Sequence, residues 1–145
     1  MKRTLITLTT LLAALLVIAL AAVSQTPKPH KHHVVIDNTL AQPESWARVL
    51  SHVGVLQRAF PGDIDIEVVN FGEGLAMLNK ADTKLQATIQ RYADSGVVFA
   101  ACQNSMRARN VTTEDLFPLA KQVPAGVAEI VMKQEAGYAY LKPID

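Results

Sequence analysis

The stretch VVFAACQNSM (Val97–Met106) contains the change from apolar to polar residues that decides the fold. Apolar residues run without a break from Val97 to Cys102 and then give way at once to polar residues. A short, continuous apolar run is typical of a strand that is buried on both faces, as in a parallel sheet. Cys102 ends the run and is the only cysteine in the chain. We therefore predict a buried strand with a lone thiol at its carboxyl end.

Further strands are expected on both sides of this one, and helical patterns alternate with them. Apolar or alternating runs predict strands at residues 33–37, 64–71, 97–102, 121–124 and 138–142. Helical patterns lie between them at residues 43–60, 75–79, 85–92, 112–115 and 125–136. This alternation implies an α/β fold with a mostly parallel sheet of about five strands and helices on both faces. Chemistry in such sheets gathers at the carboxyl ends of the strands.

Two of the helices can be described in more detail from single residues. Thr112 and Asp115 have the spacing of a capping box, which predicts the start of a short helix. In the helix at residues 125–136, we expect Val127, Ile130 and Val131 to face the core.

The N-terminus differs in composition from the rest of the chain. Lys2 and Arg3 precede a mostly apolar stretch and then small residues at the spacing that a signal peptidase reads, so residues 1–24 are predicted to be a secretory signal peptide. The stretch approaches the length that spans a bilayer, and an uncleaved anchor is the alternative. Residues 25–32 are expected to form a flexible linker and residues 33–145 the folded domain. We expect a periplasmic protein that is attached to the membrane only if the N-terminal segment is retained.

Composition and motifs exclude several classes of function. The chain has 145 residues, which suits one domain, and a formal net charge of +1, which gives no basis for a nucleic-acid partner. It has no Gly-x-Ser-x-Gly elbow, no His-Glu-x-x-His motif and no phosphate-binding loop, so we expect neither a hydrolase nor a bound cofactor. His30, His32 and His33 have no acidic or cysteine residue beside them, and we expect no metal site there.

The residues alone allow two interpretations of Cys102. In an exported protein, an odd cysteine suggests pairing with another chain or a reactive thiol. Backbone N–H groups of helical structure after the strand would favour the thiolate, and Arg107 and Arg109 follow closely. A free cysteine is also often a small buried hydrophobe that completes a core strand. Both interpretations stay open at this point.

The turn NFGEGL (Asn70–Leu75) follows the second predicted strand. Gly72 and Gly74 would let the backbone approach a ligand, with Glu73 as an acid or base. The motif lacks the longer Gly-x-Gly-x-x-Gly pattern of dinucleotide sites, and the residues favour a tight turn that needs positive φ.

Four features occur together in the C-terminal half of the chain. They are a strand that ends in cysteine followed by Asn and Met, the short TTEDL helix, the strand-to-helix entry VPAGVAEIVMKQ and the closing GYAYLKP. With VVIDN and VVNFGEGLAML earlier in the chain, they resemble the DsrE/DsrF-like family over about residues 33–143. The resemblance implies a three-layer α/β/α domain that forms homo-oligomers, or hetero-oligomers with other DsrE-like chains. It also implies sulfur relay, in which a cysteine at this strand end accepts sulfane sulfur as a persulfide and passes it on.

Cys102 matches the family's sulfur-carrying position, and its partners would be a sulfur donor and an acceptor, each a protein or a small sulfur compound. Nearby backbone and polar groups would stabilise the sulfur anion or line the site, and the candidates are Gly72, Glu73, Gly74, Gln103, Asn104 and Ser105. The following segment, QNSMRARN, departs from the alanine-rich segment with Arg-Arg-Gly of known sulfur carriers. Two alternatives therefore remain: a non-catalytic oligomeric binding or assembly module with a structural cysteine, and a thiol-redox protein that forms mixed disulfides.

Overall fold

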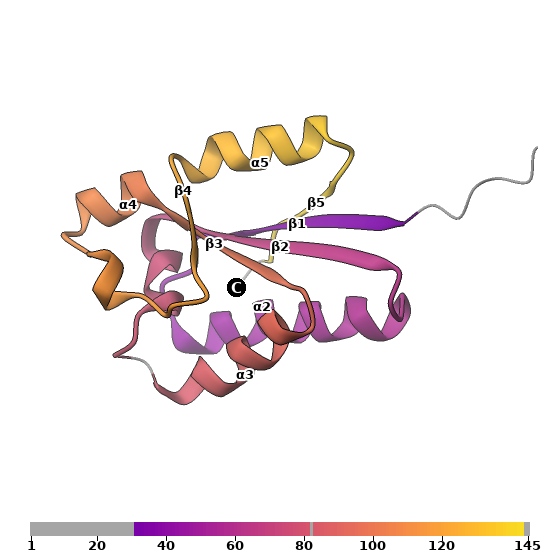
Figure 1. The fold of residues 1–145 in the computed structure, drawn as a ribbon, viewed down its shortest axis with the longest axis horizontal. Coiled ribbons are helices and arrows are strands. Elements are labelled where there is room, and N and C mark those ends of the chain that lie inside the picture. The colour runs from indigo at the N-terminus through magenta and orange to yellow at the C-terminus, as the bar shows by residue number, and fades with distance from the viewer. Residues whose placement is uncertain (1–30, 82, 144–145) are drawn as a thin grey trace, which may run out of the picture. The chain divides into compact units, whose positions relative to one another are not determined.

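The computed structural model describes residues 31–81 and 83–143, and a five-stranded sheet runs through their centre (Figure 1). The strand order is β4-β3-β2-β1-β5, and all neighbouring strands are parallel. The strands are β1 (His32–Asn38), β2 (Ile64–Asn70), β3 (Val98–Cys102), β4 (Lys121–Val123) and β5 (Ala139–Leu141). The predicted α/β fold with a parallel sheet is confirmed, although β1 already includes His32, which was expected to lie in the linker.

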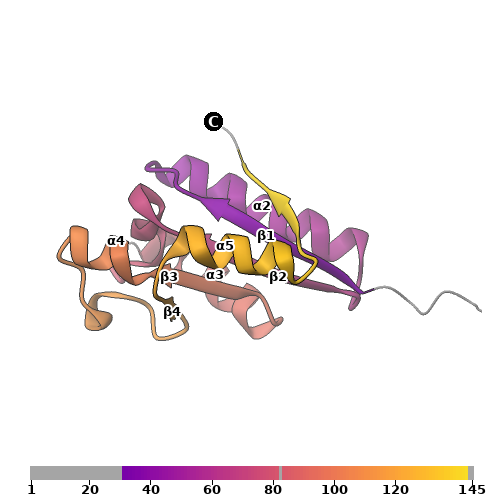
Figure 2. The same ribbon diagram turned by 90° about the horizontal axis from the view of Figure 1, so that it is seen from above.

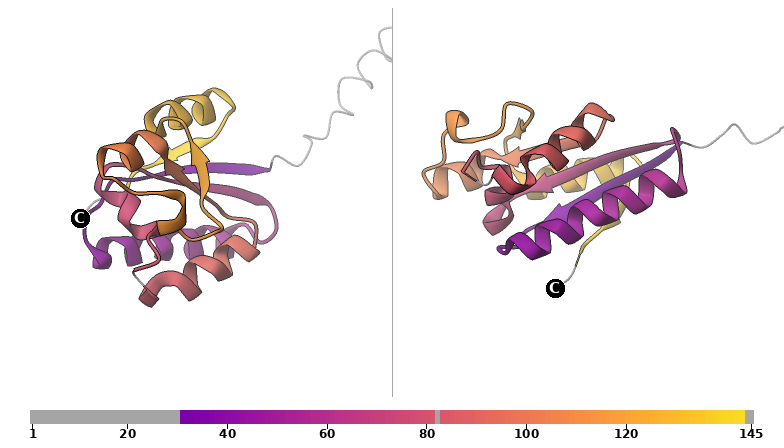
Figure 3. Two further views of the ribbon diagram at one scale, coloured as in Figure 1. Left: turned by 60° about the vertical axis from the view of Figure 1, so that its left-hand side comes forward. Right: turned by 90° about the horizontal axis from the view of Figure 1, so that it is seen from below.

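Helices cover both faces of the sheet, which gives the three layers that the family resemblance implies. α2 (Pro43–Ala59) and α3 (Thr83–Asp94) lie on one face (Figure 3), and α5 (Gly126–Glu135) lies on the other. Because α5 connects β4 to β5, it crosses the strands between these two edges (Figure 2). The segments after β2 and β3 contain shorter helices, namely the 3-10 helix η1 (Gly72–Leu78), α4 (Gln103–Ala108) and the 3-10 helix η2 (Thr113–Asp115).

Apolar side chains pack against both faces of the sheet. The larger cluster, which includes Ile36, Val68 and Phe99, lies on the side of α2 and α3. The smaller cluster lies beneath α5 and includes Val35 and Val69. Successive residues of a strand point to opposite faces, so a strand covered on both sides needs apolar residues at consecutive positions. This requirement explains why β1 and β3 could be recognised from continuous apolar runs.

The sequence also accounts for α2. Pro43 is its first residue, where a missing N–H does no harm, and Glu44 beside it suits the positive end of the helix. Trp46, Val49 and Val53 are buried at helical spacing. The predicted amphipathic helix is therefore confirmed.

The expectation for the buried side of α5 is wrong at two positions. Val127 and Val131 are 61% and 53% exposed, and Ile130 alone of the three expected residues is buried. The reason is a carboxylate in β2. Glu67 is 2% exposed, and α5 turns Lys133 toward it, with 2.6 Å between Nζ and Oε2. A buried charge must be paired, so the helix presents a polar side to the sheet.

The remaining expectations concern local structure and the N-terminus. The capping box is confirmed, since Asp115 Oδ2 accepts the Thr112 N–H at 2.8 Å. The helical turn expected at residues 75–79 overlaps η1, which begins earlier, at Gly72, and ends at Leu78. The predicted signal peptide and all but the last two residues of the predicted linker lie outside the described residues. None of the helices in residues 31–81 and 83–143 has the length and hydropathy of a membrane-spanning segment.

Candidate functional site around Cys102

Polar side chains end three neighbouring strands at one edge of the sheet. Asp37 and Asn38 close β1, Asn70 closes β2 and Cys102 closes β3. Asn38 and Asn70 lie on the α2 side, where Asn38 Nδ2 donates to Asn70 Oδ1 at 2.8 Å and to a core methionine sulfur. Asp37 and Cys102 each lie two positions after a residue of the cluster beneath α5, namely Val35 and Ala100. Residues two positions apart in a strand share a face, so both side chains point to the α5 side of the sheet. The thiol therefore lies at the carboxyl edge of the sheet, on its α5 side.

The Sγ atom of Cys102 accepts hydrogen bonds from the beginnings of two helices. Cys102 is the N-cap of α4, and the Ser105 nitrogen lies 3.4 Å from Sγ. The nitrogen of Gly126, the first residue of α5, lies 3.2 Å from the same atom. N–H groups in the first turn of a helix have no partner within the helix and carry the positive end of its dipole. Both helices therefore favour negative charge on Sγ.

The Ser105 side chain connects the site with the turn after β2. Its Oγ accepts the Gly72 N–H at 2.8 Å, and the side chain also helps to lower the pKa of the Cys102 thiol. Gly72 has a φ of +55°, in the left-handed region that glycine adopts readily. The glycine turn thus reaches the cysteine indirectly, through Ser105.

Burial and hydrogen bonding act in opposite directions on the thiol pKa. Burial raises the pKa of Cys102, which is 4% exposed. Hydrogen bonds from the Ser105 hydroxyl and from the backbone of Ser105, Gly126 and Asn104 outweigh it and hold the pKa below its ordinary value. The sulfur is therefore covered by protein, yet its immediate surroundings are polar.

Cys102 does not line the cavities of about 720 and 380 Å³, but Gln103, the next residue and a predicted site residue, lines the smaller one. Across residues 31–81 and 83–143, no three His, Cys, Asp or Glu side chains lie close enough to hold a metal ion.

The side chains of two predicted binding residues next to Cys102 form hydrogen bonds with other side chains and not with the sulfur. Gln103 Nε2 donates to Gln122 Oε1 of β4 at 3.2 Å. Asn104 Oδ1 accepts a hydrogen bond from Arg107, so this arginine does not turn back to the sulfur. Asn104 acts on the sulfur through its backbone instead.

The other two predicted positions, Glu73 and Gly74, belong to η1. The Glu73 side chain is 59% exposed and forms an ion pair with Arg109. Gly74 is a packing residue, because a Cβ there would lie 2.1 Å from the Asn38 carbonyl oxygen. Neither residue is among the groups that bond the Cys102 sulfur.

Comparison with known proteins identifies the family. The model of the DsrE/DsrF-like family matches residues 13–143. The chain belongs to the DsrE/DsrF-like family. A protein of unknown function from Methanobacterium thermoautotrophicum is 28% identical, with a TM-score of 0.73 over 77% of this chain and 99% of that one. A conserved protein of unknown function from Bacteroides thetaiotaomicron shares the fold, with a TM-score of 0.60 at 16% identity over 81% of this chain and 99% of its own. No curated protein matches the sequence.

Membership of the DsrE/DsrF-like family suggests a role in sulfur relay. The resemblance seen in the sequence is therefore confirmed. In this DsrE/DsrF-like chain, the single cysteine is the residue that ends β3 and receives the converging hydrogen bonds.

The N–H of Gly126 at the sulfur was not predicted from the sequence. Strand pairing could have revealed it, because Val123 of β4 lies beside Cys102 in the register and α5 begins shortly after Val123. Glycine is needed at this point of the DsrE/DsrF-like domain, since a Cβ on residue 126 would lie 2.9 Å from the Phe71 Cβ. The glycine thus lets the start of α5 approach the strand ends.

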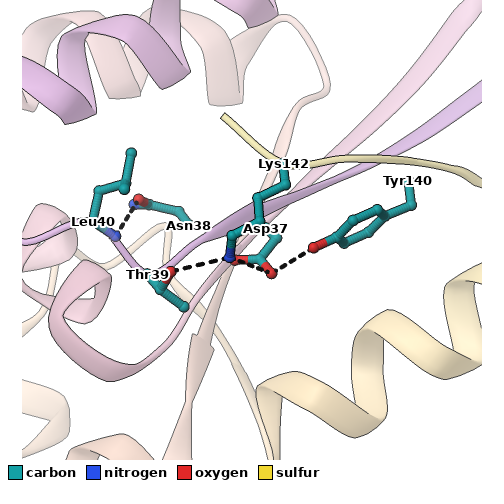
Figure 4. Close-up of polar contacts among 6 residues, drawn as sticks. All are labelled: Asp37, Asn38, Thr39, Leu40, Tyr140 and Lys142. Carbon is teal, nitrogen blue, oxygen red and sulfur yellow. Dashed lines mark hydrogen bonds and ion pairs between the residues drawn. The ribbon is translucent and has the colours of Figure 1, made fainter. Parts of the chain in front are cut away.

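A polar cluster at the end of β1 was also missed (Figure 4). Asp37 Oδ2 accepts hydrogen bonds from Tyr140 OH at 2.8 Å and from Lys142 Nζ at 3.2 Å. Burial, followed by the hydrogen bond to Asp37 and its charge, raises the pKa of Tyr140 to about 12. The only signal was an acid at the end of an apolar run. In this DsrE/DsrF-like fold the cluster attaches β5 to β1.

Proposed function

We propose that this protein carries sulfane sulfur as a persulfide on Cys102. The observation that carries the proposal is the pair of backbone donors on one sulfur atom, the N–H groups of Ser105 and Gly126. These donors favour the thiolate, which is the nucleophilic form of cysteine. Family membership supports the reaction class.

Two exchange steps make up the proposed relay. In loading, the Cys102 thiolate attacks the sulfane sulfur of a donor persulfide. A bond from Sγ to that sulfur forms, the S–S bond of the donor breaks, and its electron pair leaves on the donor thiolate. In delivery, an acceptor thiolate attacks the outer sulfur and the Cys102 thiolate leaves. No net oxidation occurs, so neither step needs a cofactor.

The proposal extends to location and partners. The charged and apolar pattern of residues 1–24 supports export to the periplasm, with membrane attachment only if that segment is retained. The donor and acceptor there are proteins or small sulfur compounds. A homo-oligomer, or a hetero-oligomer with another DsrE-like chain, is the proposed assembly.

A second candidate is a non-catalytic oligomeric binding or assembly module with a structural cysteine. Two observations favour it. Cys102 is 4% exposed. The outer side of α5 exposes Val127, Val131 and Met132 at 61%, 53% and 52%, which an oligomer interface would cover.

Intact-mass spectrometry separates the two candidates. The purified protein is incubated with polysulfide, or with thiosulfate and a sulfurtransferase. The relay predicts an added mass of one sulfur atom on the wild type and none on Cys102→Ser. If the folded wild type gains no sulfur and resists iodoacetamide even at about pH 9, where ordinary thiols ionise, the cysteine is a packing residue and the relay is wrong.

A further inference from the structure

The cavity of about 380 Å³ is formed by α4, the segment that follows it and β4, beside the strand end that carries Cys102. Gln103 of α4 and Gln122 of β4 line it. Gln103 is the residue after Cys102, and Gln122 pairs with Ala101, the residue before it. Small-molecule sites usually have volumes of about 300–1,000 Å³. The cavity therefore has the size and the position of a small-ligand site next to the thiol residue.

Hydrogen bonds between side chains hold the polar part of the lining in place. Gln103 Nε2 donates to Gln122 Oε1 at 3.2 Å, and Gln122 Nε2 donates to Thr113 Oγ1 at 2.8 Å. A side-chain amide has an acceptor as well as donors, so these bonds leave Gln103 Oε1 as an acceptor and the Thr113 hydroxyl as a donor. Because these groups are already oriented, a ligand that bonds to them loses less free energy to side-chain ordering.

Two charged side chains of opposite sign also line the cavity, and they come from different segments. Arg107 belongs to α4 and Glu114 to η2. Arg107 donates to Asn104 Oδ1 through one nitrogen, and a guanidinium has further N–H donors for an anionic group. The η2 backbone is held from outside the cavity, because Lys80 Nζ donates to the Glu114 carbonyl oxygen. The cavity thus offers a cation and an anion at separate positions.

Apolar side chains complete the lining. Met106 is 6% exposed, and Val111 packs against the larger core cluster. A methionine thioether is polarizable and adapts to irregular neighbours, so it suits an apolar or sulfur-containing group. A ligand that fills the cavity therefore needs a small side chain of this kind in addition to its charges.

We propose that this cavity binds a free α-amino acid with a small sulfur-containing side chain, such as cysteine or its persulfide. Its carboxylate pairs with Arg107, since a planar guanidinium matches a carboxylate in two parallel hydrogen bonds. Its ammonium pairs with Glu114, and its side chain lies on Met106 and Val111. The choice of sulfur rests on the proposed function, and the inference narrows the sulfur donor or acceptor to a zwitterionic small compound. Cys102 does not line the cavity, so binding brings the compound to the strand end and not onto Sγ itself.

The two charges select against other sources of sulfur. A simple anion such as thiosulfate can pair with Arg107, but it shares the cavity with the like charge of Glu114, which weakens its binding. A cysteine within a protein chain has neither the free ammonium nor the free carboxylate of an amino acid. Of these compounds, only the free amino acid satisfies both charged side chains.

Isothermal titration calorimetry of the full-length wild type with S-methyl-L-cysteine tests the site, because a thioether cannot exchange sulfur with Cys102. Two analogues keep the side chain and lack one charge: S-methylcysteamine lacks the carboxylate and methylthiopropionate lacks the ammonium. We expect saturable binding of S-methyl-L-cysteine and about ten-fold weaker binding of each analogue, as for the loss of a hydrogen bond to a charged group. No saturable binding, or equal binding of the three compounds, overturns the inference.

Variants assign the two charges to their side chains. Arg107→Met should weaken binding of S-methyl-L-cysteine about ten-fold and remove the preference over S-methylcysteamine. Glu114→Gln should remove the preference over methylthiopropionate. Both side chains are exposed, and Arg109→Met, which removes the same charge outside the cavity, is the matched control and should bind as the wild type does. Equal losses in Arg107→Met and Arg109→Met would show a general charge effect and overturn the assignment.

Failure of this inference is distinguishable from failure of the relay. If Cys102 takes up sulfur but the wild type does not bind S-methyl-L-cysteine, the cavity has no such role and the relay stands. If S-methyl-L-cysteine binds with the expected preferences but Cys102 takes up no sulfur, the relay is refuted and the cavity is a site for a zwitterion.

Discussion

Replacing Lys133 with methionine tests how α5 is held on the sheet. Methionine keeps much of the aliphatic stem and removes the charge. Glu67 Oε2 would lose its partner at 2.6 Å, and Oε1 already has no hydrogen-bond partner among the described residues. Removing one partner of a buried ion pair costs about 3–5 kcal/mol. Because the Lys133 side chain is 21% exposed, water can partly replace it. We expect the lower end of that range, about 3 kcal/mol.

Urea unfolding followed by circular dichroism measures this loss, and the chain offers a matched control. Lys31 Nζ lies 2.7 Å from Asp65 Oδ1, but the two side chains are 49% and 42% exposed. Such exposed pairs contribute about 0–1 kcal/mol, so Lys31→Met should change the free energy of unfolding little. Glu67→Gln combined with Lys133→Met should recover part of the loss. The two ion pairs have similar distances, 2.6 and 2.7 Å, and differ in burial. If Lys133→Met and Lys31→Met lower the free energy of unfolding equally, burial does not strengthen the Lys133 pair and the reasoning is refuted.

The remaining predictions concern a buried acid, a crowded glycine and a tyrosine. Burial raises the pKa of Glu129, and so do a hydrogen bond to the buried carboxylate of β2 and the charge of that carboxylate. The contribution of Glu129 to stability is therefore complete below the pKa that it has in the unfolded chain, and it is lost as pH rises through its pKa in the folded protein. In urea unfolding, Glu129→Gln should exceed the wild type in stability at neutral pH, with a gap that narrows toward about pH 4; no gap at neutral pH would contradict this. Gly74→Ala places a Cβ 2.1 Å from Asn38 O and should lower the free energy of unfolding by about 3 kcal/mol; an unchanged urea midpoint would show that the backbone can yield. Absorbance titration should show Tyr140 ionising near pH 12, and earlier in Asp37→Asn; identical curves would exclude Asp37 as a cause.

The central strands β1, β2 and β3 could be predicted from the sequence because most of their residues are buried. The run that ends at Cys102 is apolar at consecutive positions, and such a run has few alternatives to a buried strand. The capping box of Thr112 and Asp115 was equally readable, since both partners lie within one turn of chain. The position of the thiol at a strand end followed from the same local pattern.

The features that could not be predicted depend on contacts between distant residues. The buried side of α5 is set by Glu67, which is far from Lys133 in sequence, so the apolar spacing of the helix alone indicated the wrong face. The donor at Gly126 depends on the pairing of β4 with β3. The role of Gly72 depends on Ser105, which belongs to another helix. Side-chain type identified Cys102 as the candidate nucleophile, whereas the groups that bond its sulfur are backbone amides, which every residue except proline possesses.

Helix α5 contacts both the Cys102 sulfur and the buried carboxylate of the sheet. Its first residue donates to the sulfur, and Lys133, two helical turns or about 10 Å further along, fastens the helix to Glu67. Because both contacts belong to one helix, a change in the Lys133–Glu67 ion pair is expected to shift the Gly126 N–H relative to the Cys102 sulfur. Reagents that probe the thiol will consequently also report how firmly this helix is seated.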